Sequence, residues 1–148
     1  MELNESLMSF IVMASEKFKK KSSAIIRRHG LTFSHYCVLK NLVECECGRD
    51  TVGNVSKRML VTAPNVTGIT KRMERAGLIE RKNDARDERL IVLQVTERGR
   101  ETFHEIKEIQ QQHCRAYLEI YSPAQKEDVL SVLKHILQEV KNLPNSFS

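Results

Sequence analysis

The chain has 148 residues, and it lacks tryptophan and the features that mark several classes of protein. None of its apolar runs reaches the roughly 18 residues of a membrane span, so no membrane association is expected. The opening MELNESLMSF carries acids where a secretory signal has basic residues, which indicates a cytoplasmic protein. Low-complexity segments are absent and 41% of the residues are apolar, which excludes disorder.

Cysteines are also few, at positions 37, 45, 47 and 114. Without a secretory signal they are expected to be reduced thiols, not a disulfide framework. Cys45 and Cys47 are one residue apart in a polar loop next to Arg49. Such a pair can share a metal but rarely forms a mutual disulfide, because disulfide geometry is restrictive. A redox- or metal-sensing role for Cys45 and Cys47 is therefore kept as an alternative, although no metal site is predicted outright.

Motifs for catalysis are missing as well. The sequence has no nucleophile elbow, phosphate-binding loop, paired carboxylates or metal-binding helix motif. These absences argue against an enzyme, and no cofactor is expected.

Positive charge is present and is concentrated in one segment. Residues 56–100 hold 11 basic and 6 acidic residues, so they carry the whole net charge of +5. The remainder of the chain is electrically balanced. A basic segment on a neutral scaffold is typical of a protein that contacts a polyanion.

Hydrophobic periodicity predicts six helices and one hairpin. Gly30 and Gly77 end helices, whereas Thr32, Thr62 and Thr96 begin them. Helices are expected over about 4–28, 32–43, 51–60, 62–76, 96–121 and 122–140, and strands over 78–82 and 90–95. The short helix, tight turn and second helix form a helix-turn-helix, and the hairpin after it makes this a winged helix.

The second helix of that pair carries the candidate DNA contacts. If Val66, Ile69 and Met73 face inward, its opposite face shows small residues followed by cations. Small residues let a helix approach the floor of the major groove, and cations meet phosphates. The predicted contacts on this helix are Thr62, Pro64, Asn65, Thr67, Gly68, Lys71, Arg72 and Arg75.

The hairpin tip adds Arg86, Asp87 and Arg89 to the candidate contacts. An Asp two residues before an Arg can hold the guanidinium by a bidentate pair. Arg89 held in this way would enter the minor groove.

These motifs together resemble the MarR-type (multiple antibiotic resistance) transcriptional regulators over nearly the whole chain. The resemblance is carried by Leu31-Thr32, by Gly77-Leu78-Ile79-x-Arg81, by Asp87-x-Arg89 and by Val95-Thr96-x-x-Gly99. It implies a single mainly α (α+β) winged helix-turn-helix domain. Residues 32–98 would form the DNA-binding lobe, and residues 1–30 and 99–148 a helical dimerisation region.

The resemblance also implies a homodimer that binds a pseudo-palindromic operator in double-stranded DNA and represses nearby genes. Release would come from a small aromatic or other effector. Phe10, Phe18, His29 and Tyr36 are candidates to line its pocket. A winged-helix protein-interaction module without a DNA partner is the remaining alternative, but such a module would not need all the net charge on one segment.

Overall fold

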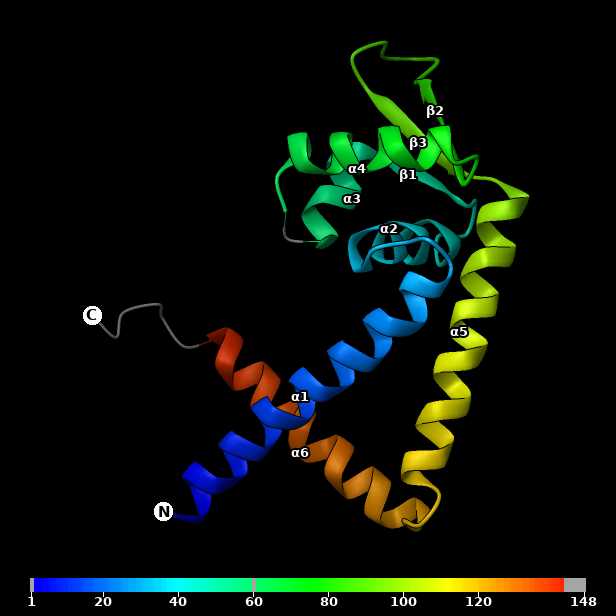
Figure 1. Ribbon diagram of the computed structural model, residues 1–148. Coiled ribbons are helices and arrows are strands. Elements are labelled where there is room, and N and C mark those ends of the chain that lie inside the picture. Colours follow the sequence, from blue (N-terminus) through cyan, green and yellow to red (C-terminus); the bar gives the residue numbers. More distant parts are fainter. Residues whose placement is uncertain (1, 60, 143–148) are drawn as a thin grey trace. The chain divides into compact units, whose positions relative to one another are not determined.

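The computed structural model describes residues 2–59 and 61–142 (Figure 1). The chain divides into two compact units between Gln110 and Gln111. The helices are α1 (Leu3–Arg28), α2 (Phe33–Val43), α3 (Val52–Met59), α4 (Ala63–Arg75), α5 (Glu97–Leu118) and α6 (Pro123–Asn142). The strands are β1 (Arg49–Thr51), β2 (Ile79–Asn83) and β3 (Ile91–Val95). The predicted mainly α winged-helix fold is confirmed. Leu60, the expected end of α3, lies outside the described residues.

Local capping interactions fix where the helices begin and end. Thr32 and His35 form a capping box: the Thr32 hydroxyl accepts from the His35 N–H, and the His35 Nδ1 accepts from the Thr32 N–H. Burial lowers the pKa of His35, with a smaller contribution from Arg72, and this shift favours the neutral ring whose Nδ1 can accept the bond. Gly30 and Gly77 follow helix ends with φ of 72° and 70°, the left-handed conformation that glycine adopts most readily.

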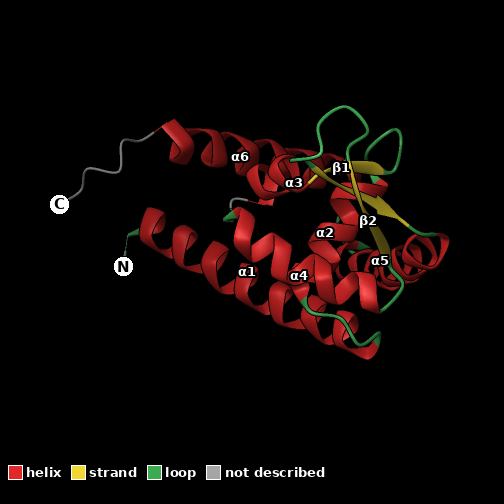
Figure 2. Ribbon diagram, turned by 90° about the horizontal axis from the view of Figure 1, so that it is seen from above, coloured by secondary structure: helices red, strands yellow, loops and turns green. Residues whose placement is uncertain are grey.

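The sheet has three antiparallel strands in the order β1-β3-β2, not the two of the predicted hairpin. Strand β1 was missed because a polar three-residue segment shows no alternation of apolar and polar positions. It pairs with β3 in the register Arg49↔Gln94 and Thr51↔Val92, whereas β2 pairs Lys82 with Val92. Figure 2 shows the strands grouped beside α2 and α3.

The core of the first unit holds these helices and the sheet together. Phe103 of α5 stacks on Tyr36 of α2 with ring centroids 5.4 Å apart. Around this stack, fully buried side chains come from α1, α2, α3, α4, β2, β3 and α5: Ile26, Val38, Leu39, Leu42, Val55, Val66, Met73, Ile79, Leu93 and Ile106. Helices α3 and α4 and the sheet therefore share one continuous apolar core.

The helices of the chain ends expose much apolar surface. Helix α5 ends at Leu118, three residues before the predicted Tyr121. Ser122 and Gln125 then form the predicted capping box at the start of α6. Along α6, Val129, Leu133, Leu137 and Val140 are 41–59% exposed.

Within the described ranges, no helix combines the length and hydrophobicity that crossing a bilayer requires.

Candidate nucleic-acid interface

Helix α4 has one buried face and one exposed face. Val66, Thr70 and Met73 are buried, and the Thr70 hydroxyl donates to the carbonyl of Thr67. Ile69, placed on the inner stripe from the sequence, is only half-buried. The exposed face carries Pro64, Asn65, Gly68, Lys71, Arg72 and Arg75, and Thr67 is half-buried at its edge. The predicted inward positions Val66 and Met73 are buried, but Thr70, which was not predicted, is buried in place of Ile69.

The start of α4 is open to a ligand. Thr62 stands at the N-cap, as predicted, but its side chain makes no capping hydrogen bond. Pro64 lies in the first turn, where its missing N–H costs nothing. A Cβ added to Gly68 would meet no atom within 4 Å, so the outer side of the helix is open at Gly68. A broad partner can approach this end of the helix closely.

Two aspartates order the wing tip by binding its backbone. Asp84 Oδ1 accepts hydrogen bonds from the N–H groups of Arg86, at 2.8 Å, and Asp87, at 3.1 Å. These bonds are the main reason that the pKa of Asp84 lies below its ordinary value. Asp87 Oδ1 accepts from the N–H of Arg89 at 3.0 Å. The expected pairing of the Asp87 carboxylate with the Arg89 guanidinium is therefore corrected, since the nearer donor is the main-chain N–H two residues on.

The cations of this surface remain available. Among the described residues, none of Lys71, Arg72, Arg75, Arg86 and Arg89 forms an ion pair with another side chain. All five are exposed. Unpaired cations on one helix face and one wing can neutralise the phosphates of a nucleic acid.

A polar cluster that the sequence reading missed supports α3, the first helix of the pair. Asp50 accepts from Arg58 at 2.6 Å and from the amide of Asn54 at 2.7 Å. Arg58 Nε also donates to Asn41 Oδ1 of α2 at 2.7 Å. Asp50, Asn54 and Arg58 share four-residue spacing, but Asp50 lies in a strand and Asn41 in another helix, so only the folded chain reveals the complete network.

The cysteine loop lies against that cluster. Cys45 Sγ is 3.7 Å from Asp50 Oδ2 and 3.9 Å from Arg58 Nη2. Burial, with Asp50 next, raises the pKa of the Cys45 thiol, whereas reactive cysteines have a lowered pKa. Cys47 is exposed and contacts the carbonyl of Arg49. In the described part of the chain, no group of three or more His, Cys, Asp or Glu side chains is arranged to hold a metal ion.

The four residues proposed for an effector pocket are not brought together within one chain. Tyr36 is buried in the core stack and donates to Gln110 Oε1 at 2.9 Å. His29 lies 3.6 Å from the Glu105 carboxylate. Phe10 and Phe18 are 68% and 52% exposed. Phe10 precedes His29 by 19 positions, which is about 28 Å along a helix axis.

Residues 18–106 match the family described as Transcriptional regulator SarA/Rot. The homoprotocatechuate degradative operon repressor of Escherichia coli is 28% identical over 97% of this chain and 93% of its own. The HTH-type regulator YfiV of Bacillus subtilis is 30% identical over 61% of this chain, which spans only 58% of that protein.

Solved structures share the fold. AbsC, a MarR family regulator from Streptomyces coelicolor, superposes with a TM-score of 0.82 at 20% identity, covering 97% of both chains. MepR of Staphylococcus aureus, in a structure described as a DNA complex, gives a TM-score of 0.78 at 21% identity over 89% of this chain and 96% of MepR. The MarR-type resemblance predicted from the motifs is thereby confirmed.

Proposed function

Since this chain belongs to the SarA/Rot family of transcriptional regulators and has the MarR-type winged-helix fold, we propose that it represses genes as a homodimer bound to operator DNA. Its family consists of regulators, not enzymes. In the proposed complex, α4 enters the major groove of each half-site and the wing tip reaches the neighbouring minor groove.

One observation carries the proposal: α4 combines an uncovered N-terminal half with unpaired cations further along. Pro64, Asn65 and Gly68 leave space for base edges, and Lys71 and Arg75 lie one and two turns beyond. A solvated surface helix needs neither the bare backbone nor the concentration of cations. The MepR structure, described as a DNA complex, supports DNA as the partner of this fold.

The homodimer is supported by the exposed apolar side chains of the terminal helices. Leu3, Phe10 and Met13 of α1 are 84%, 68% and 56% exposed. Helix α6 carries an exposed apolar stripe that consists of Val129, Leu133, Leu137 and Val140. Apolar surface of this extent usually marks an interface. A two-fold dimer also matches a two-fold operator.

An effector that releases the DNA belongs to the same proposal. Because Phe10, Phe18, His29 and Tyr36 do not meet in one chain, a pocket that uses them needs contributions from both protomers or a rearrangement. A small aromatic molecule is the expected class, and the relative named for a homoprotocatechuate degradative operon supports this choice.

Fluorescence anisotropy with labelled DNA from upstream of the protein's own gene tests the proposal. Lys71→Ala should weaken binding by about 1–3 kcal/mol if Lys71 reads a base, and the loss should then differ among operator variants. Lys40→Ala, which removes the same charge from an exposed position of α2, is the matched control. Equal effects of the two substitutions, or no saturable binding by the parent protein, would contradict the assignment of α4.

A further inference from the structure

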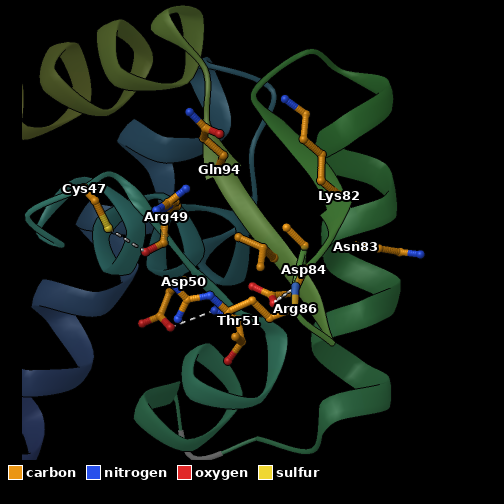
Figure 3. Close-up of a pocket in the computed structure, with 11 residues that line it drawn as sticks. Cys47, Arg49, Asp50, Thr51, Lys82, Asn83, Asp84, Arg86 and Gln94 are labelled. Atoms are coloured by element: carbon orange, nitrogen blue, oxygen red, sulfur yellow. Dashed lines mark hydrogen bonds between the residues drawn. The ribbon is translucent and has the colours of Figure 1, made fainter. Parts of the chain in front are cut away.

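The face of the sheet that points away from the core is hollowed. A groove of about 530 Å³ runs between β1 and the wing, with β3 as its floor (Figure 3). Val92 and Gln94 of β3 line it, and the register places Arg49, Thr51 and Lys82 beside them on the same face. Leu93, the intervening residue of β3, is buried on the opposite face. The groove is thus separate from the effector candidates and from the exposed face of α4.

Two guanidinium groups are available to a ligand in this groove. Arg49 lines it from β1, and Arg86 lines it from the wing tip. Both residues are exposed, and neither guanidinium has a hydrogen bond or ion pair with the described residues. Lys82 also lines the groove, but its ammonium group lies 2.5 Å from the Glu80 carboxylate. The arginines are therefore the cations of the groove that have no close ion pair among the described residues.

The carboxylates of the groove are already engaged. Asp50 accepts from Arg58, Asn54 and the Thr51 N–H. Asp84 accepts from two backbone N–H groups of the wing tip. Neither carboxylate forms a close ion pair with Arg49 or Arg86, although both guanidiniums attract Asp84 at longer range. The guanidinium N–H groups therefore remain open to an acceptor on a ligand.

The remaining polar groups of the groove can also donate. Thr51 accepts the N–H of Asn54 through its Oγ1 and keeps its own hydroxyl hydrogen for another partner. The Gln94 amide is exposed at the floor. Two planar guanidiniums with a hydroxyl and an amide suit a group with several acceptor oxygens, and arginine binds phosphate bidentately.

We propose that the groove between β1 and the wing is an anion site that holds a phosphate group between Arg49 and Arg86. The group belongs either to the backbone of DNA alongside the wing or to a free phosphorylated small molecule. The volume exceeds that of one phosphate, so the remainder of either ligand can be accommodated. Binding of a DNA phosphate at this site rests on the proposed function, whereas binding of a free phosphorylated molecule does not.

The first experiment titrates the full chain with inorganic phosphate at constant ionic strength and follows backbone amide signals by NMR. Saturable shifts are expected at Arg49, Thr51, Ala85 and Arg86. Arg49→Gln should weaken phosphate binding about tenfold, the effect of losing one charged hydrogen-bonding group. Arg27→Gln removes the same charge from an exposed position on the last turn of α1 and should leave the affinity unchanged.

The second experiment measures operator binding of the same two variants over a salt series. If DNA supplies the phosphate, Arg49→Gln lowers the salt slope by about 0.9 for each phosphate that the protein no longer neutralises. An unchanged slope, together with weakened binding of inorganic phosphate, assigns the site to a free anion. Absence of saturable shifts in the groove, or equal weakening by Arg27→Gln, would overturn the site. The phosphate titration uses no DNA, so it stands even if the parent protein fails to bind an operator.

Discussion

Arg58 Nη2 of α3 lies 2.6 Å from Asp50 Oδ2 of β1, and this ion pair fastens the first helix of the helix-turn-helix to the sheet. The Asp50 side chain is 13% exposed. Burial opposes its ionisation, but the hydrogen bonds from Asn54, Arg58 and Thr51 together outweigh burial, and the pKa of Asp50 is lowered. The charged carboxylate is therefore a structural element of the lobe that presents α4.

Asp50→Asn should lower the free energy of unfolding by about 1–3 kcal/mol at pH 7, because it leaves Arg58 without its carboxylate partner. Since folding lowers the pKa of Asp50, this stabilisation is fully present above the unfolded pKa. It is lost as the pH falls through the lower folded pKa. Urea titrations at pH 7 and below pH 4 measure the difference in unfolding free energy between parent and variant. This difference should become smaller in acid. Asp128→Asn in α6 is the exposed control. A difference in unfolding free energy that does not change with pH would contradict the stabilisation by ionised Asp50.

For Asp87 at the wing tip, the hydrogen bonding and the net charge predict opposite changes in DNA affinity. Asp87→Ala removes a negative charge near DNA, yet it should weaken binding because the Arg89 N–H loses its acceptor and the tip loses order. A loss of about 0.5–1.5 kcal/mol is expected, the value of one such hydrogen bond. Arg89→Ala should cost about 1–3 kcal/mol and make the salt dependence shallower.

The neighbouring Glu88 provides the matched control for the wing. It is exposed, and Glu88→Ala removes the same charge without removing a hydrogen bond to the wing backbone. Anisotropy titrations should show Glu88→Ala binding DNA as tightly as the parent protein or more tightly. If Asp87→Ala behaved in the same way, ordering of the wing by Asp87 would have no role in binding.

The fold was largely predictable because its signals are local. Thr32, Gly30 and Gly77 mark helix ends through their own backbone and side-chain chemistry, and the burial of Val66 and Met73 in α4 follows from helical period. Strand β1 was missed because its pairing with β3 joins residues more than 40 positions apart and leaves no periodic trace. The groove between Arg49 and Arg86 depends on that same pairing. Asp87 was correctly placed at the wing, but spacing alone does not decide whether a carboxylate binds a side chain or the main chain.

Thiol reactivity should follow burial and local charge. Burial raises the pKa of both Cys37 and Cys45, so both have less thiolate at a given pH. Cys47 is exposed. Labelling with limiting iodoacetamide at pH 8, read by mass spectrometry of peptides, should therefore modify Cys47 before Cys45 and Cys37. Faster modification of Cys45 would revive the redox alternative, and Cys45→Ser would then be expected to abolish any oxidant response.

The last prediction concerns the exposed stripe of α6. Leu137 is 57% exposed in the single chain, and burying a leucine side chain stabilises an association by about 1.5–3 kcal/mol. Leu137→Glu places a charge in the stripe and should shift the dimer towards monomer in sedimentation equilibrium. Operator affinity should fall with it, because separate protomers no longer engage both half-sites together.

Gln138→Glu supplies the control for this substitution, since it adds the same charge at the adjacent exposed position, away from the stripe. It should leave the dimer intact. Circular dichroism must show equal helix content in both variants, so that loss of α6 itself is excluded as the cause. A Leu137→Glu protein that stays dimeric at the concentrations where the parent is dimeric would remove α6 from the proposed interface. The exposed residues of α1 would then be the next surface to test in the same way.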